Sequence, residues 1–234
     1  MKNNESAREQ RSMFSMTFMI MAVLFSVCLI ASNLYASKIF SVMGITLPGA
    51  VIIFPISYIL NDCLCEVYGY RKARLVIWIG FAMNLFIVLM SQLVVALPAA
   101  SFWTGNEAFH LVFGATPKAL VASMLGFLAG STLNAWVMSK MKVASNGRRF
   151  SLRAVLSSSV GESADSLIFI PIMFWSIGLK AMLLMMLAQV VTKVVYEIVI
   201  LPVTNVVVKW VKRREGIDTY DREISYNPFK ILDI

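Results

Sequence analysis

Long apolar runs follow one another along this chain, separated by short polar stretches. There are six of them: residues 12–37, 39–61, 75–106, 119–139, 154–179 and 181–208. Only the last two contain charges, Glu162 and Asp165 in the fifth run and Lys193 and Glu197 in the sixth. Each run exceeds the roughly 20 residues that an α-helix needs to cross a ~30 Å hydrocarbon core. The pattern predicts an all-α, polytopic membrane protein with six transmembrane helices.

Composition and charge support this interpretation. Hydrophobic residues make up 59% of the 234, and the mean hydropathy is +0.75, whereas soluble domains are roughly 45–50% apolar. Seventeen basic residues lie in the two tails and in the connections after the second and fourth helices, against three in the alternate connections. By the positive-inside rule, both termini are predicted to be cytoplasmic. The net charge of +8 is thus a topology signal, and no nucleic-acid partner is expected.

The same boundaries divide the chain into three parts. Residues 1–12 are predicted to be a cytoplasmic N-terminal tail, residues 13–210 a six-helix transmembrane domain, and residues 211–234 a cytoplasmic C-terminal tail. No internal repeat or second domain is visible in the sequence.

Glu162 and Asp165 place two carboxylates near the middle of the fifth predicted helix. A charged side chain at that depth costs roughly 2.5–3.5 kcal/mol on insertion scales, so it is kept where water or a partner receives it. The i, i+3, i+4 spacing puts Ser158 and Phe169 on the same face. The sequence therefore predicts a polar site in the membrane centre.

The sixth predicted helix carries matching polar groups. Gln189, Lys193, Tyr196 and Glu197 share one face, and Lys193 lies at the depth of the two carboxylates. A buried cation opposite buried anions is what desolvation requires. A static ion pair between the two helices is one interpretation, but the excess of carboxylates over lysine favours a functional site.

The second predicted helix closes with Asp62 and Glu66, four residues apart, and Arg74 follows closely. A salt bridge at the cytoplasmic surface is the simple interpretation of these charges. The alternative is an inner gate or coupling group formed by Asp62, Glu66 and Arg74, to which we add Glu197.

Three of the asparagines within the predicted helices are candidate site residues. Asn84 is near the midplane and is a candidate for ligand binding, although amides there more often bond between helices. Asn33 and Asn134 lie near helix ends and are candidate gate residues. Asn134 extends a stripe with Gly126 and Gly130 that is typical of close helix packing.

The sequence contains no signature of a common enzyme class: no Walker A loop, His-Glu-x-x-His, Gly-x-Ser-x-Gly or dinucleotide fingerprint. One histidine and three cysteines without a Cys-x-x-Cys motif predict no metal site, disulfide or cofactor. A carrier with polar groups at the midplane is therefore the preferred prediction. An intramembrane enzyme that uses Glu162 and Asp165 as an acid/base pair is the alternative from another class.

The residue types suggest a ligand. Carboxylates accept paired N–H bonds, amides such as Gln189 donate and accept, and Phe169 and Tyr196 offer flat faces. A planar heterocycle with a ring N–H and an exocyclic amine beside a carbonyl, as in a guanine-like base, would use all of these. A small cation or an organic amine also suits the carboxylates, so the residues alone leave these alternatives open.

Three segments resemble the bacterial queuosine precursor transporter family: residues 31–38 (ASNLYASK), 54–74 (FPISYILNDCLCEVYGYRKAR) and 161–165 (GESAD), together with Lys193 and Glu197. The resemblance covers residues 14–210, and segment 54–74 is its most specific part. It implies import of 7-cyano-7-deazaguanine, and of 7-aminomethyl-7-deazaguanine, through the bacterial inner membrane for synthesis of the tRNA base queuosine. It also implies a fold similar to the substrate-binding components of energy-coupling vitamin transporters.

With such a ligand, three kinds of contact are expected: Glu162 or Asp165 to the N–H edge, Asn84, Gln189 or Lys193 to the carbonyl, and Phe169 or Tyr196 against the ring. Three energy sources are left open, namely a proton gradient, downhill diffusion, and a separate ATPase complex. The oligomeric state is also left open, a homo-oligomer included.

Overall fold

The computed structural model describes residues 14–42, 45–114 and 117–231. The predicted N-terminal tail, residues 1–12, lies outside these ranges. The elements in chain order are α2 (Met16–Tyr35), β1 (Ile39–Val42), β2 (Ile45–Pro48), the 3-10 turn η1 (Gly49–Ile52), α3 (Phe54–Cys63), the π-helical turn η2 (Leu64–Tyr68), α4 (Tyr70–Val95), α5 (Asn106–Phe113), α6 (Pro117–Ala144), α7 (Phe150–Phe174), the 3-10 turn η3 (Trp175–Ile177) and α8 (Leu179–Glu215).

Five of the six apolar runs give long helices, namely α2, α4, α6, α7 and α8. A helix satisfies its own backbone hydrogen bonds, which an apolar segment in lipid requires. In the described part of the chain, four stretches are long and apolar enough to cross a membrane: α2, α4, Asn106–Ala144 and α8. At 25 residues α7 is also long enough, about 37 Å, but it carries the two carboxylates and several serines. The chain is a helical, multi-pass membrane protein.

The second apolar run differs from the single helix that its length suggests. It begins with an antiparallel hairpin, in which Phe40 pairs with Leu47 and Val42 with Ile45. Helical structure starts at Gly49, but it is divided into η1, α3 and η2. Such π-helical turns are frequently found at functional sites. The helical part of this run is therefore short and divided, because strands β1 and β2 occupy its beginning.

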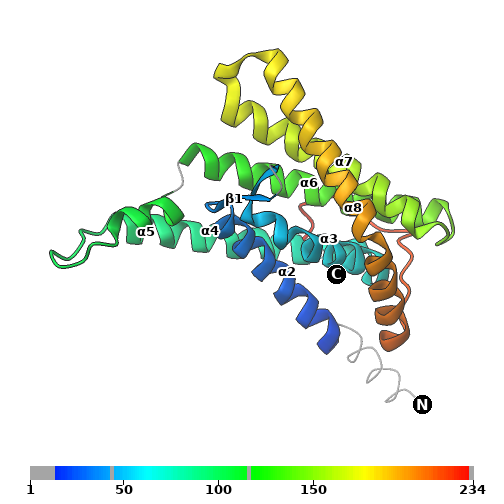
Figure 1. The fold of residues 1–234 in the computed structure, drawn as a ribbon. Coiled ribbons are helices and arrows are strands. Elements are labelled where there is room, and N and C mark those ends of the chain that lie inside the picture. The colour runs from blue at the N-terminus through cyan, green and yellow to red at the C-terminus, as the bar shows by residue number, and fades with distance from the viewer. Residues whose placement is uncertain (1–13, 43–44, 115–116, 232–234) are drawn as a thin grey trace.

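The helices form two arms joined at a common base. Along the first arm α6 packs against α7, and α8 returns beside α7 and continues to α3 and η2 (Figure 1). The second arm is α4 with α5, α2 packs against α3 and α4, and β1 lies near the middle of the view in Figure 1. The short helix α5 was not predicted; it lies in the polar connection between the third and fourth runs.

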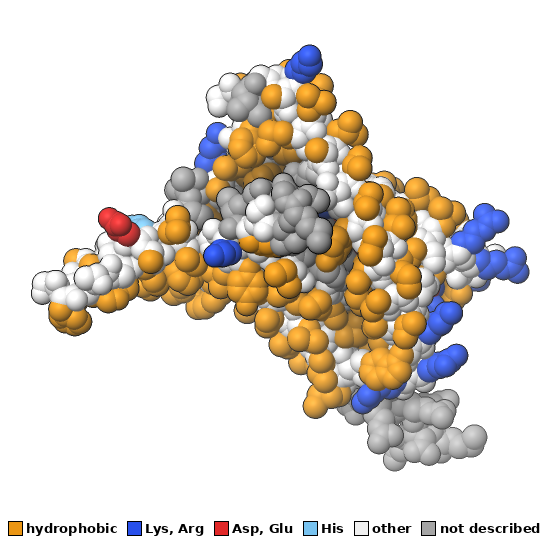
Figure 2. Space-filling view, viewed as in Figure 1, with side chains coloured by type: hydrophobic (Ala, Val, Ile, Leu, Met, Phe, Trp, Pro, Cys, Tyr) orange, Lys and Arg blue, Asp and Glu red, His pale blue; other side chains and the backbone are white. Residues whose placement is uncertain are grey.

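One end of the bundle collects the basic residues. The start of α4, the end of α6, the start of α7 and the end of α8 lie there, and we call this the basic end. Figure 2 shows a mostly hydrophobic face, with most of the visible lysines and arginines along the right edge and a few at the top, left and centre. This distribution matches the alternation of basic connections in the sequence. That the basic end faces the cytoplasm stays a prediction.

The segment after α8 packs against the basic end. The Asp221 carboxylate accepts from the backbone N–H of Tyr70 at 2.8 Å and from the Ser139 hydroxyl at 2.5 Å. The indole of Trp78 donates to the carbonyl of Pro228 at 2.8 Å. The C-terminal segment therefore ties the start of α4 to the end of α6.

Candidate functional site

A cavity of about 620 Å³ lies among α2, α3, α6, α7 and α8. Its wall includes aromatic rings and an unusual number of polar side chains for the interior of a membrane protein. The polar lining residues are Ser32, Asn33, Ser57, Asn61, Ser123, Ser131, Asn134, Ser158, Glu162, Asp165, Gln189, Thr192, Lys193 and Tyr196. The cavity can therefore receive a polar ligand of moderate size.

At the centre of this wall, Lys193 of α8 bridges the two carboxylates of α7. Its ammonium donates to Glu162 and, at 2.9 Å, to Asp165. The three side chains are between 12% and 21% exposed, so they are partly open to the cavity. With all three ionised the cluster keeps one excess negative charge. The carboxylates can therefore accept from the N–H groups of a ligand while Lys193 stays paired with them.

The predicted helix faces line the cavity except for Glu197. Glu162 and Asp165 line the cavity together with Ser158 and Phe169, as their spacing on one face requires. On α8, the neighbours of Lys193 that line the cavity include Gln189 and Tyr196, whereas Glu197 lies behind the wall.

Close packing of α6 on α7 sets the position of Asp165. A Cβ atom on Gly126 would overlap Asp165 Oδ1, and one on Gly130 would lie 2.9 Å from the carbonyl oxygen of Gly161. The small-residue stripe therefore lets the two backbones approach. It brings Asn134 against α7, where it lines the cavity.

Three lining residues keep a buried polar atom without a hydrogen-bond partner among the described residues. These atoms are Asn61 Oδ1, Asn134 Oδ1 and Ser158 Oγ. Leaving such an atom unsatisfied costs about 1–3 kcal/mol. Unsatisfied buried atoms of this kind are typical of a site that is completed by water or by a ligand.

Asn84 is not part of the cavity wall. Its Oδ1 accepts from Asn33 Nδ2 at 2.8 Å, and Asn33 lines the cavity. Asn33 thus separates Asn84 from the cavity, and the structure does not support the predicted direct contact of Asn84 with a ligand. Asn84 holds Asn33 in place instead.

Glu66 lies at the basic end, outside the cavity wall. Arg153 donates to both of its oxygens, at 2.5 and 3.0 Å, and Lys212 donates to Oε1 at 2.7 Å. Glu66 and Arg153 are each 1% exposed. Lys142 donates to the Glu66 backbone carbonyl and to Asp218. Glu66 therefore ties η2 to α7 and α8.

Asp62 and Glu197 form a second buried group, adjacent in sequence to the lining residues Asn61 and Tyr196. Their carboxyls lie close enough to share a hydrogen bond across α3 and α8, and each residue is 1% exposed. Asp62 Oδ2 and both Glu197 oxygens meet no donor among the described residues. Two carboxyls can bond in this way when one of them holds a proton.

The described hydrogen bonds of Arg74 go to the segment after α8. Its Nη1 donates to the backbone carbonyls of Ser225 and Asn227, at 3.2 and 2.7 Å, and its guanidinium lies over the Tyr70 ring. The predicted grouping of Glu66 with Arg74 is therefore replaced by Glu66 with Arg153 and Lys212.

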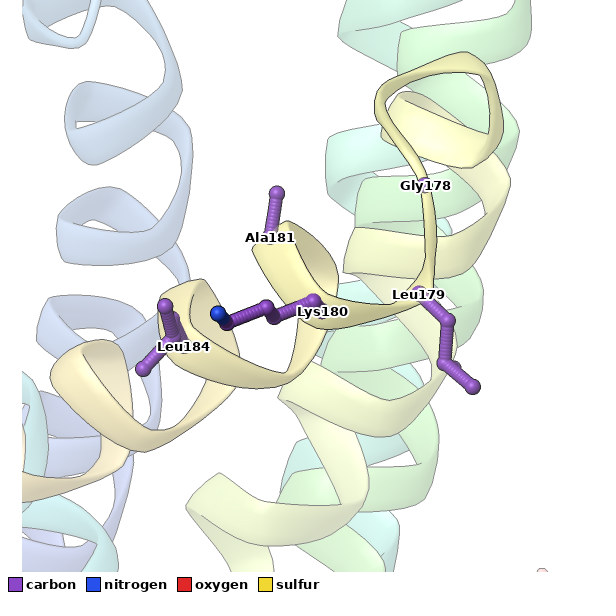
Figure 3. A pocket seen from close by; sticks show the side chains of 5 residues that line it. All are labelled: Gly178, Leu179, Lys180, Ala181 and Leu184. Carbon is purple, nitrogen blue, oxygen red and sulfur yellow. The ribbon is translucent and has the colours of Figure 1, made fainter.

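A second, open depression lies at the outer start of α8. Its five lining residues, 178–181 and 184, include one charged side chain, Lys180. Figure 3 shows Leu179 and Lys180 pointing in opposite directions rather than toward a common centre. It offers no convergent polar groups, so we assign the site to the larger cavity.

Sequence reasoning missed several of these residues. Arg153 and Lys212 were assigned to the basic topology signal, and only the tertiary structure shows them bound to Glu66. Asn61 directly precedes Asp62 in segment 54–74, and the predicted gate included Asp62 but not Asn61. Residues at i and i+1 point about 100° apart on a helix, which was the available signal.

Comparisons with known proteins identify the family of this chain. A family model described as "Putative vitamin uptake transporter" matches residues 48–207. A protein of Bacillus subtilis (strain 168), "Probable queuosine precursor transporter", is 28% identical over 149 residues, which are 63% of this chain and 65% of that protein. No solved structure matches the chain. Because the family model spans more than half of its length, this multi-pass membrane protein belongs to the vitamin uptake transporter family.

Proposed function

We propose that this chain imports queuosine precursors through the bacterial inner membrane, with both termini in the cytoplasm. The main substrate is 7-cyano-7-deazaguanine, and 7-aminomethyl-7-deazaguanine is the second. The name of the Bacillus relative supports this substrate class, although the match covers 65% of that protein. The chemistry of the cavity provides the independent support.

The observation that carries the proposal is the cluster of Glu162, Asp165 and Lys193 in the cavity wall. A purely structural ion pair between α7 and α8 would need no space beside it. The cavity volume, about 620 Å³, falls within the roughly 300–1,000 Å³ of typical small-molecule sites. A ligand that donates N–H groups and accepts from an ammonium suits this wall.

Each lining group then has a role in binding a guanine-like base. Glu162 and Asp165 accept from the ring N–H and the exocyclic amine, which are adjacent donors. Lys193 or Gln189 donates to the carbonyl. Phe169 or Tyr196 stacks on the ring, an interaction that contributes about 1–3 kcal/mol for a nucleic-acid base.

Ligand-induced thermal stabilisation of the purified protein tests this proposal. A ligand present at 100 times its dissociation constant stabilises the native state by about 2.7 kcal/mol. We expect 7-cyano-7-deazaguanine to raise the melting temperature, and adenine and uracil to have no effect. Glu162→Gln and Asp165→Asn should weaken this effect, whereas the exposed Glu107→Gln should leave it unchanged. Equal stabilisation of all four proteins would refute the assignment.

A second candidate is a substrate-binding component for a vitamin, which would need a separate ATPase complex. The description of the matching family favours it. Proteoliposomes that contain this chain alone separate the two: the proposed importer accumulates substrate, with or without an imposed pH gradient, and a component that depends on an ATPase does not. Recovery of chemically unchanged ligand would argue against an intramembrane enzyme.

A further inference from the structure

One part of the cavity wall has no role in the scheme above. Asn61 of α3, Asn134 of α6 and Ser158 of α7 line the cavity, and we call them the acceptor wall. They are 6%, 7% and 4% exposed. The Oδ1 atoms of the two asparagines and the Oγ atom of Ser158 have no partner in the described ranges.

Three neighbouring serines of α7 bond within their own helix, whereas Ser166, which does not line the cavity, lacks a partner among the described residues as Ser158 does. The hydroxyls of Ser157, Ser159 and Ser163 on the same helix donate to the carbonyls of Ala154, Val155 and Ser159, respectively. None of these three is among the residues that line the cavity. Serines in membrane helices commonly satisfy themselves in this way. Ser158 is buried, like Ser157, but it does not make such a bond in the structure.

The amide nitrogens of two other asparagines are paired: Asn33 donates to Asn84, and Asn205 donates to Ser151 and to the carbonyl of Leu201. Asn61 and Asn134 line the cavity, and their Oδ1 atoms have no partner among the described residues. Three helices thus bring unsatisfied oxygens to one wall.

We infer that the acceptor wall binds the N–H of the five-membered ring of the base, and so selects a free base over its nucleoside. This rests on the proposed function. Once the carboxylates take the ring N–H and the amine of the six-membered ring, the remaining ring donor is the N–H of the five-membered ring. Amide oxygens accept and cannot donate, so they suit this group.

The burial of the wall adds a steric reason. A nucleoside carries its sugar on the nitrogen that would face Asn61, Asn134 and Ser158. The sugar replaces this N–H donor with a bulky group, so the oxygen that would accept from it loses its partner. A buried polar wall discriminates strongly against an analogue that lacks the complementary hydrogen.

The test compares 7-cyano-7-deazaguanine with its derivative methylated on the five-membered-ring nitrogen, in direct binding to the full chain. The wild-type protein should prefer the free base by about tenfold or more, as loss of a buried hydrogen bond predicts. In Ser158→Ala and Asn134→Ala, affinity for the free base should fall about 3- to 10-fold while that for the methylated base changes little. The matched control Ser159→Ala, whose hydroxyl bonds within its own helix, should keep the wild-type preference.

Two outcomes would overturn the inference without touching the proposed function: equal wild-type affinity for the two ligands, or an unchanged preference in both wall variants. Failure of the wild-type protein to bind either ligand would instead reject the proposed function, and the inference with it. Melting temperatures of the unliganded variants identify any that fail to fold, and the wild-type comparison stands without them.

Discussion

Arg153 binds both carboxylate oxygens of Glu66, with Nη1 2.5 Å from Oε2 and Nη2 3.0 Å from Oε1. Both residues are almost completely buried, and the pair joins η2 to the start of α7. A two-point pair of this kind fixes the orientation of both side chains. The basic end is therefore held by a defined ion pair rather than by solvated surface charges.

Removal of one partner of this pair should be costly. We expect Glu66→Gln to lower the free energy of unfolding by about 3–5 kcal/mol, because Arg153 and Lys212 would lose their buried counter-charge. Replacing Glu66 and Arg153 together with methionine should recover much of this loss. Chemical denaturation in detergent measures both effects. A single variant as stable as the wild-type protein would contradict the role of the pair.

Close contact between α6 and α7 predicts that Gly126→Ala impairs ligand binding. The added methyl group would displace Asp165, whose Oδ1 atom occupies that space. We expect a loss of substrate affinity of about tenfold or more, since Asp165 is proposed to hold the ligand. The lipid-facing Val121→Ala serves as control, because Val121 is 53% exposed. Unchanged affinity in Gly126→Ala would show that Asp165 does not need this position.

The facing carboxyls of Asp62 and Glu197 predict an unusual tolerance. Asp62→Asn should retain or increase thermal stability, because an amide N–H can donate to Glu197 in place of the shared proton. Asp62→Leu should destabilise by about 1–3 kcal/mol, since it leaves Glu197 without a partner. Melting curves of the two variants test this. If Asp62→Asn were as damaging as Asp62→Leu, a shared proton would be the wrong description.

Asp218 gives a prediction on acid stability. Burial acts to raise the pKa of Asp218, but hydrogen bonds from Lys142 and Lys212 lower this pKa below its ordinary value of 3.8. A lowered pKa in the folded state stabilises the protein above the unfolded-state pKa, and this contribution is lost as the pH falls through the folded-state value. The stability difference between wild-type protein and Asp218→Asn should thus be constant from about pH 5 to 8 and shrink as the pH falls below the ordinary pKa of 3.8. A difference that grows on acidification would contradict this assignment.

The sequence allowed the membrane helices and the centre of the site to be predicted, for two physical reasons. Apolar runs longer than a bilayer is thick have few alternatives to a helix. Helical spacing placed Glu162, Asp165 and Lys193 at one depth, and the structure has them in contact.

Other features depend on tertiary contacts that no local pattern encodes. The β1–β2 hairpin is as apolar as a helix and gives the same hydropathy signal. The pairing of Glu66 with Arg153 joins residues 87 positions apart, so charge spacing within one helix pointed to Arg74 instead. Asn84 was expected to contact a ligand because it lies near the midplane, but depth alone does not say which side of a helix faces the cavity. In the structure Asn84 bonds to Asn33.

The most direct test of the account is uptake of labelled 7-cyano-7-deazaguanine by proteoliposomes that contain this chain alone. We expect saturable uptake by the wild-type protein and by Glu107→Gln, and uptake reduced at least about tenfold in Glu162→Gln and Asp165→Asn, since each removes an acceptor for a ligand N–H. Normal uptake by both carboxylate variants would contradict the claim that Glu162 and Asp165 bind the substrate.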